Sequence, residues 1–262
     1  TLVIVEGKTV LVTGVGPGLG REVAACALRD GANVVIAARN TEKLEKISAK
    51  LDPSGKRIAH CRADITDSAS CEALMQAATD RFGGVDAVVQ VAALDTLFGT
   101  LQSTSVEDWQ ASMNTNVIGT LQLVKSAVEP LKKRGGGSVV LIGSQSMWDP
   151  PPSPQIAYAS AKGALVSAML HITRELGPDR IRINMVIPTW MWGPPVEGYV
   201  KWQAQERGVG EDEVVGEITA KMPLGEIPAD EDVAEAVVFF CSDRSRMITG
   251  QTLLVNAGEL LR

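Results

Sequence analysis

The stretch Thr13–Gly20, TGVGPGLG, ends the apolar run TVLVT and leads into an amphipathic segment. Glycines let the backbone turn tightly and approach a ligand, and the next helix offers free N–H groups and the positive end of its dipole. A glycine-rich string between a strand and a helix is typical of a dinucleotide site. The residues expected to hold the pyrophosphate are Gly14, Gly16, Pro17, Gly18, Leu19 and Gly20.

The rest of the chain continues this alternation of apolar runs and amphipathic segments. The predicted strands are Thr9–Thr13, Asn33–Ala38, Arg57–Arg62, Ala87–Ala92, Ser138–Ile142, Arg182–Ile187 and Thr252–Val255. The predicted helices are Gly18–Asp30, Thr41–Leu51, Asp67–Phe82, Val106–Arg134, Ala157–Gly177 and Asp230–Ser242. Several strands are continuously apolar, as expected where both faces of a sheet are covered. The sequence predicts an α/β chain with a doubly wound parallel β-sheet, a three-layer Rossmann fold forming a single domain over residues 1–262.

One segment departs from the alternation. Residues 189–222 contain Pro194, Pro195, several glycines and the acidic stretch EDEVVGE, and we predict an irregular segment there. Because long loops in compact domains are usually functional, we expect this segment to be a substrate lid.

Composition excludes several classes of function. The chain has 262 residues and a formal net charge of -6, and its one basic cluster is residues 132–134, so no nucleic-acid partner is expected. His60, His171 and four scattered cysteines give no spacing typical of a zinc site, so no metal is expected.

Location follows from similar observations. No apolar run approaches the roughly 18 residues of a membrane span, and the start TLVIVEGKTVLVTG lacks the features of a signal peptide. Scattered cysteines are typical of buried, reduced thiols. We therefore expect a cytoplasmic protein without a membrane partner.

The end of the second predicted strand indicates which dinucleotide is bound. An acidic residue there would bind the ribose 2′-hydroxyl of NAD, whereas an arginine accommodates the 2′-phosphate of NADP. The chain reads Ile-Ala-Ala-Arg-Asn at 36–40, so Arg39 favours NADP(H) over NAD(H), although Arg39 is also compatible with a solvated helix start. Asp64 and Ile65, after the third strand, are candidates for the adenine edge; capping of the following turn explains Asp64 almost as well.

Tyr158 and Lys162 are four residues apart in a predicted helix, so they share one helical face. A neighbouring cation stabilises a phenolate and lowers the pKa of the phenol. Tyr158 is therefore a candidate general acid or base.

These motifs together resemble the short-chain dehydrogenase/reductase family. The resemblance is carried by TGVGPGLG at 13–20, NVIG at 116–119, Ser144 after the fifth strand, Tyr158 with Lys162, and GQTLLVNAG at 250–258. It covers essentially the whole chain. It implies a nicotinamide cofactor, interconversion of a small-molecule carbonyl and an alcohol, and a homotetramer or homodimer.

The resemblance also implies a role for each matching residue. Tyr158 would exchange the proton, and Ser144 would stabilise the charge that develops on the substrate oxygen. Lys162 would hold the nicotinamide ribose and lower the pKa of Tyr158. Asn116 would position a water for proton relay.

The chain departs from the family pattern at three places. Thirteen residues separate Ser144 from Tyr158 and eleven separate Ser146 from Tyr158, so each serine is one residue away from the usual spacing. We favour Ser144, because a strand leads into it. The family's Asn-Asn-Ala-Gly appears as QVAA at 90–93, where Ala92 and Ala93 still let a cofactor approach, and its Pro-Gly appears as Pro188-Thr189.

Aromatic residues gather in the two segments that flank the reacting centre in this family. Four of the five tryptophans lie there, and the expected substrate pocket comprises Ser146, Met147, Trp148, Trp190, Trp192, Tyr199 and Trp202. Such walls suit a bulky apolar ketone or alcohol. Packing within the lid or at a subunit interface explains these aromatic residues nearly as well.

The leading hypothesis is NADPH-dependent reduction of a bulky ketone. The alternatives are an NAD-linked alcohol dehydrogenase, a 3-oxoacyl reductase, and a catalytically silent dinucleotide-binding regulatory protein. The presence of Asn116, Ser144, Tyr158 and Lys162 disfavours the silent protein.

Overall fold

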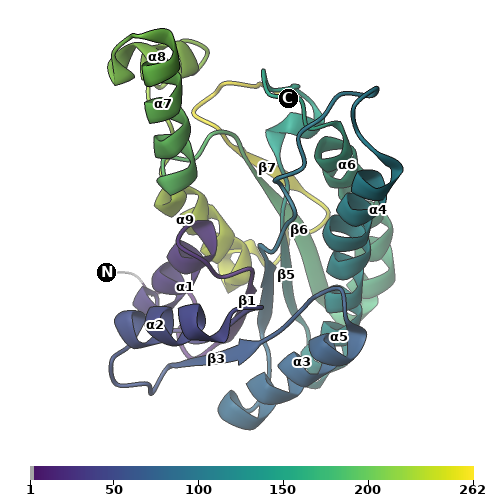
Figure 1. Cartoon of the computed structure of the whole chain (residues 1–262). Coiled ribbons are helices and arrows are strands. Elements are labelled where there is room, and N and C mark those ends of the chain that lie inside the picture. Colours follow the sequence, from purple (N-terminus) through teal and green to yellow (C-terminus); the bar gives the residue numbers. More distant parts are fainter. Residues whose placement is uncertain (1–2) are drawn as a thin grey trace.

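The seven strands form one parallel sheet in the order β3-β2-β1-β4-β5-β6-β7 (Figure 1). The computed structural model describes residues 3–262, so residues 1 and 2 of the expected domain lie outside the described part. The strands are β1 (Thr9–Thr13), β2 (Asn33–Ala38), β3 (Ile58–Arg62), β4 (Ala87–Gln90), β5 (Gly137–Ile142), β6 (Ile181–Pro188) and β7 (Thr252–Val255). The predicted doubly wound α/β fold is confirmed.

Helices connect the strands. The α-helices are α1 (Leu19–Arg29), α2 (Thr41–Leu51), α3 (Ser68–Phe82), α4 (Val106–Met113), α5 (Thr120–Lys133), α6 (Ile156–Leu176), α7 (Pro194–Arg207), α8 (Glu211–Thr219) and α9 (Asp230–Cys241). The short segments are the π-helical η1 (Asn114–Gly119) and the 3₁₀ turns η2 (Gln145–Met147), η3 (Gly177–Asp179) and η4 (Asp243–Ser245).

Two hydrophobic cores lie on opposite faces of the sheet. Val10 and Val12 of β1 pack in the core that includes residues of α1, α2 and α9, whereas Leu11 packs in the core with α3, α5 and α6. Successive side chains of a strand point to opposite faces, so a strand buried on both faces is continuously apolar. This double burial explains the apolar runs of the sequence.

The expected helix Val106–Arg134 is interrupted. The π-helical segment η1 lies between α4 and α5, and it buries Asn116 and Val117. Such widened turns often mark functional sites. The expected strand Ala87–Ala92 ends earlier, at Gln90, where the Gln90 side chain donates a hydrogen bond to the Ala92 carbonyl at 2.8 Å.

The prediction of an irregular segment at 189–222 is wrong, because most of it forms α7 and α8. Pro194 and Pro195 lie at the start of α7, where a missing N–H costs nothing, and Gly208 ends α7 with φ +66°. The two helices share a small core of Val200, Ala204 and Val214. They lie beyond the carboxyl ends of the strands (Figure 1), and their role as a lid stays a prediction.

None of the helices within residues 3–262 combines the length and the apolar character needed to cross a membrane.

Candidate active site

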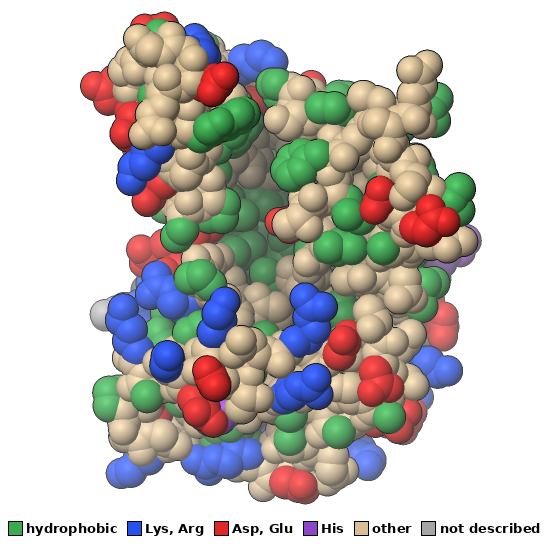
Figure 2. All heavy atoms as spheres, viewed as in Figure 1, with side chains coloured by type: hydrophobic (Ala, Val, Ile, Leu, Met, Phe, Trp, Pro, Cys, Tyr) green, Lys and Arg blue, Asp and Glu red, His purple; other side chains and the backbone are tan. Residues whose placement is uncertain are grey.

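A cavity of about 1010 Å³ opens at the edge where the parallel strands end. Its walls come from segments that follow β1 to β6, with the start of α7 and Glu259. Figure 2 shows the cleft, with hydrophobic side chains inside it and Lys and Arg side chains around its lower end. Ligands of open parallel α/β sheets bind in this position.

The glycine-rich turn forms one end of the cavity. Gly14 has φ +73°, and it packs directly on the backbone of Ala92. A Cβ on Gly16 would meet no atom of residues 3–262 within 4 Å, so the surface over Gly16 is open. No side chain in the described chain caps the start of α1 after Gly18, which leaves first-turn N–H groups for an anion. Pro17, Leu19 and Gly20 complete this wall, which fits the pyrophosphate of a dinucleotide.

Three residues line the part of the cavity predicted for the adenosine. Arg39 is exposed after β2, and Asp64 and Ile65 follow β3. Asp64 Oδ1 accepts hydrogen bonds from the Thr66 N–H at 3.0 Å and the Thr66 hydroxyl at 2.7 Å. These bonds hold the pKa of Asp64 below its usual value. Asp64 thus fixes the turn, and its contact with adenine stays a prediction.

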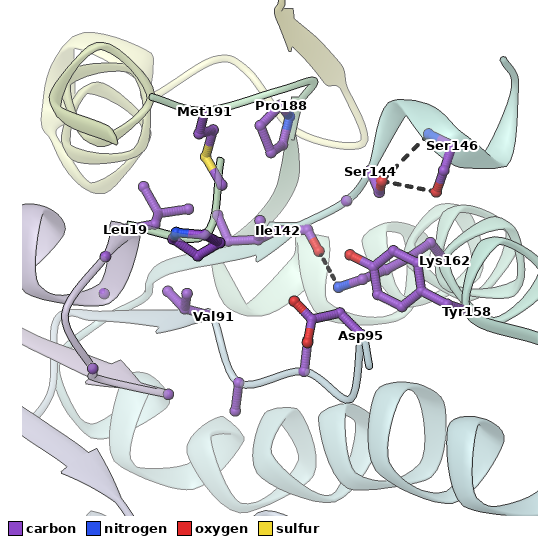
Figure 3. Close-up of a pocket in the computed structure, with 18 of the residues that line it drawn as sticks. Leu19, Val91, Asp95, Ile142, Ser144, Ser146, Tyr158, Lys162, Pro188 and Met191 are labelled. Atoms are coloured by element: carbon purple, nitrogen blue, oxygen red, sulfur yellow. Dashed lines mark hydrogen bonds between the residues drawn. The ribbon is translucent and has the colours of Figure 1, made fainter. Parts of the chain in front are cut away.

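Tyr158 and Lys162 line the other end, one turn apart on α6 (Figure 3). Lys162 is 1% exposed, and its Nζ donates a 2.6 Å hydrogen bond to the Ile142 carbonyl at the end of β5. The same Nζ lies 5.5 Å from the centre of the Tyr158 ring. Strand β5 therefore holds the lysine beside the phenol.

Burial sets the protonation of this pair. The prediction that Lys162 lowers the pKa of Tyr158 is wrong: burial raises this pKa, the negative charge of Asp95 raises it further, and the effect that opposes them comes from the Ser144 hydroxyl. Burial lowers the pKa of Lys162 to about 8, and Asp95 acts against this shift. At neutral pH the phenol is protonated and the amine is mostly charged. The pair can therefore donate a proton to a substrate oxygen.

Both candidate serines lie in the cavity. The Ser144 and Ser146 hydroxyl oxygens are 2.8 Å apart, and the Ser146 N–H donates to Ser144 Oγ at 3.3 Å. Ser144 also interacts with Tyr158, so Ser146 supports Ser144 while Ser144 faces the phenol (Figure 3). Pro150–Pro152, which follow in the longer loop, line the cavity as well.

Asn116 differs from Ser144, Tyr158 and Lys162 in its surroundings. It is buried, and its side chain accepts from the Leu94 N–H at 2.8 Å and donates to the Leu94 carbonyl at 3.0 Å and to Ser112 Oγ at 3.1 Å. Its neighbours Asn114 and Thr115 line the cavity, whereas Asn116 is not part of the lining within residues 3–262. The direct effect of Asn116 is to fix the loop after β4, and proton relay through it stays a prediction.

The residues that depart from the family pattern at 92–93 and 188–189 still lie at the cavity. Ala92, Ala93, Pro188 and Thr189 all line it. The Thr189 hydroxyl donates to the Glu259 carboxylate, which ties β6 to the segment after β7.

The expected aromatic pocket is only partly assembled. Ser146 and Trp190 line the cavity. The structure places Met147, Trp148, Trp192, Tyr199 and Trp202 outside the lining formed by residues 3–262.

Contacts with other parts of the chain explain why several of these aromatic residues lie outside the lining. Trp148 lies under the Arg262 guanidinium, 4.4 Å from its ring centre, and Trp192 joins Ala229 in an isolated parallel bridge. Tyr199 packs between Trp190 and Trp202, with ring centres 5.1 and 6.1 Å away. Trp148, Tyr199 and Trp202 therefore pack against other side chains outside the lining of the cavity.

Sequence reasoning missed Asp95. It lies in the loop after β4, and Figure 3 shows its carboxylate beside Lys162 and Tyr158. Only the step from strand to loop could have signalled it, because residues after parallel strands end at the ligand edge.

Comparisons with known proteins agree with this geometry. A family model described as enoyl-(acyl carrier protein) reductase matches residues 14–259. The chain is 31% identical to dehydrogenase/reductase SDR family member 4 of Sus scrofa, over 98% of this chain and 88% of that protein. It is also 31% identical to the 3-oxoacyl-[acyl-carrier-protein] reductase FabG of Escherichia coli, over 97% of both chains.

Solved structures show the same fold. L-sorbose reductase from Gluconobacter frateurii, complexed with NADPH and L-sorbose, superposes with a TM-score of 0.92 over 100% of both chains, at 23% identity. The matched family model, the relatives and the cavity with Tyr158 and Lys162 lead to one conclusion: the chain belongs to the short-chain dehydrogenase/reductase family, whose members are nicotinamide-dependent oxidoreductases acting on alcohols and carbonyls.

Proposed function

We propose that this protein reduces a bulky ketone to its secondary alcohol with NADPH. The observation that carries the proposal is the convergence of Ser144, Tyr158 and Lys162 at one end of a cavity whose other end is the glycine-rich turn. This arrangement fits a dinucleotide: the glycine-rich turn would hold its pyrophosphate, and Lys162 would hold the ribose of its nicotinamide half. When bound, the nicotinamide supplies the hydride.

Residues of the chain bind and protonate the oxygen of the substrate carbonyl. Tyr158 donates its proton to that oxygen, and Ser144 donates a hydrogen bond that stabilises the developing charge. Lys162 keeps a positive charge next to the phenol, which would stabilise the phenolate left after the proton is donated. The Ile142 carbonyl holds the Lys162 ammonium in place, and the Ser146 hydroxyl holds that of Ser144.

Arg39 supports the preference for NADP(H). It lines the cavity after β2, and the residues at 36–40 include no carboxylate for a ribose 2′-hydroxyl. A guanidinium binds a phosphate through charge-assisted hydrogen bonds.

Apolar side chains support a bulky ketone. The lining that suits an apolar substrate comprises Pro150, Pro151, Pro152, Trp190, Met191, Pro194, Pro195 and Val196. These residues belong to the loop after β5 and to the segment that leads into α7.

We also infer that the protein works as a homodimer or homotetramer. Ile118 of η1 and Leu170 of α6 are 46% and 52% exposed, and their two elements pack against each other. Exposed apolar residues on two elements that pack together suit contact with a second copy of the chain. Light scattering on the wild type and on Leu170→Asp tests this inference: a monomeric wild type contradicts it.

Steady-state kinetics test the cofactor and the substrate class together. We expect a bulky ketone such as 4-tert-butylcyclohexanone to be reduced with a higher kcat/KM than acetone, and NADPH to be preferred to NADH. Arg39→Ala should raise the KM for NADPH about tenfold and change that for NADH much less, because one charge-assisted contact is lost. Arg62→Ala, a charge removed from the end of neighbouring β3 but outside the lining, is the matched control. Equal effects of Arg39→Ala on both cofactors contradict the NADP assignment, and a preference for small ketones contradicts the substrate class.

A further inference from the structure

Asp95 is held firmly by its backbone. Gln155 Nε2 donates to the Asp95 carbonyl at 2.8 Å, and Asn116 holds the preceding residue, Leu94, at both its N–H and its carbonyl. A parallel bridge joins Gly99 to Gln155, directly before α6. The loop that carries Asp95 is therefore tied to the start of the helix that carries Tyr158.

The side chain of Asp95 is free, in contrast to its backbone. Within residues 3–262 its carboxylate has neither a hydrogen-bond partner nor an ion-pair partner. It lines the cavity and lies beside the Tyr158 ring and the Lys162 ammonium (Figure 3). When a substrate fills the cavity, this carboxylate loses the water molecules bound to it. It then needs a hydrogen-bond donor on the substrate in their place.

The negative charge of Asp95 acts on the proton chemistry in two opposite ways: it helps keep Lys162 charged, and it opposes ionisation of Tyr158. A negative charge beside a phenol opposes formation of the phenolate, which is the state that Tyr158 reaches after donating its proton. The negative charge of Asp95 therefore fits a role in binding, where a donor on the substrate offsets it.

The position of Asp95 specifies where that donor lies. The reacting oxygen must contact both the Ser144 and the Tyr158 hydroxyls, so the reacting carbon lies next to them. Asp95 lies beside the same tyrosine, on the side of the loop after β4. A substituent on a carbon adjacent to the carbonyl is therefore the part of the substrate that faces it.

We propose that Asp95 selects ketones that carry a hydrogen-bond donor, a hydroxyl or an ammonium group, on the carbon next to the carbonyl. This inference rests on the proposed reductase function and specifies its substrate class. In the reaction, the hydride from NADPH forms the new C–H bond, the π electrons of the carbonyl move to its oxygen, and that oxygen takes the Tyr158 proton. The donor group itself is unchanged, and Asp95 binds it throughout.

Three matched ketones test the proposal. Acetophenone has no donor, 2-hydroxyacetophenone adds a hydroxyl, and protonated phenacylamine adds an ammonium group. We expect the wild type to reduce at least one donor-bearing ketone with a kcat/KM about tenfold or more above that of acetophenone, since sites built for a donor reject analogues that lack it. The arm with the larger gain identifies the hydroxyl or the ammonium as the natural donor.

Substitution of Asp95 completes the test. Asp95→Ala should reduce kcat/KM for the preferred donor-bearing ketone at least tenfold more than that for acetophenone. Glu107→Gln, which removes an exposed carboxylate of α4 outside the lining, should leave the ratio of the two ketones unaltered. The assays are run at pH 6.5, below the Lys162 pKa of about 8, to limit loss of the Lys162 charge in Asp95→Ala.

The outcomes separate this inference from the proposed function. Equal losses for all three ketones in Asp95→Ala, or no preference for a donor in the wild type, overturn the role of Asp95 and leave the reductase function standing. Absence of any NADPH-linked carbonyl reduction overturns the reductase function itself, and with it this inference.

Discussion

Gly14 and Ala92 lie so close that a Cβ on Gly14 would be 2.2 Å from the Ala92 backbone nitrogen. The end of β1 and the end of β4 therefore meet backbone to backbone under the cavity. Gly14 also has φ +73°, a conformation that residues with a Cβ rarely adopt. The fold therefore requires a glycine at position 14, whether or not a ligand is bound.

Alanine substitutions of two glycines in the turn should therefore act differently. Gly14→Ala should lower the stability of the protein by more than about 2 kcal/mol, because it combines a clash with an unfavourable φ. Gly16→Ala should keep the wild-type Tm but weaken NADPH binding, because its Cβ projects into open space where the pyrophosphate is expected.

Thermal unfolding of the cofactor-free protein and fluorescence titration with NADPH measure the two effects. A Gly16→Ala protein that binds NADPH with wild-type affinity would contradict the placement of the pyrophosphate on this turn.

Asn116→Ala should destabilise the protein by about 1–3 kcal/mol, since the change leaves buried polar groups of Leu94 without partners. It should also lower kcat more than it weakens NADPH binding, because the loop that carries Asp95 loses its anchor. Urea unfolding and steady-state kinetics measure both quantities. Wild-type stability in Asn116→Ala would show that the side chain does not hold this loop.

The pH dependence of ketone reduction should have an alkaline limit set by Lys162. Reduction needs the Tyr158 proton and the Lys162 charge, and the pKa of Lys162 is about 8. The rate should therefore be highest below this pKa and fall as the pH rises through it.

Asp95→Asn should move that alkaline limit to lower pH. The carboxylate raises the pKa of both Lys162 and Tyr158, so its removal lowers both. Profiles of kcat/KM for acetophenone, which has no donor for Asp95, isolate this effect. A shift to higher pH in Asp95→Asn would contradict the electrostatic coupling.

Regular alternation made most of the fold predictable. The bounds of β1, β2 and α2 agree with those expected, because each combines a clear apolar pattern with a marked end such as Gly14 or the Asn40 cap. The π-helical segment η1 was not predicted, since it depends on tertiary contacts of Asn116 with Leu94 rather than on local propensity.

The site was less predictable where it depends on loops. Tyr158 and Lys162 share a helix face, so their spacing alone brought them together. Tyr199 and Trp202 fell outside the lining because α7 turns them toward each other and toward Trp190. Asp95 was missed because the direction of a loop after a short strand is set by distant partners such as Gln155.

In the proposed reaction, Tyr158 donates the proton in an NADPH-linked reduction. The direct measurement of this step is ketone turnover by Tyr158→Phe, with NADPH affinity measured on the same sample and Tyr199→Phe as the matched loss of a hydroxyl. We predict that Tyr158→Phe lowers kcat/KM for the ketone at least about 100-fold, the low end of the contribution of a general acid, and changes the Kd for NADPH less than about threefold. Turnover by Tyr158→Phe within about threefold of the wild type would contradict proton donation by Tyr158.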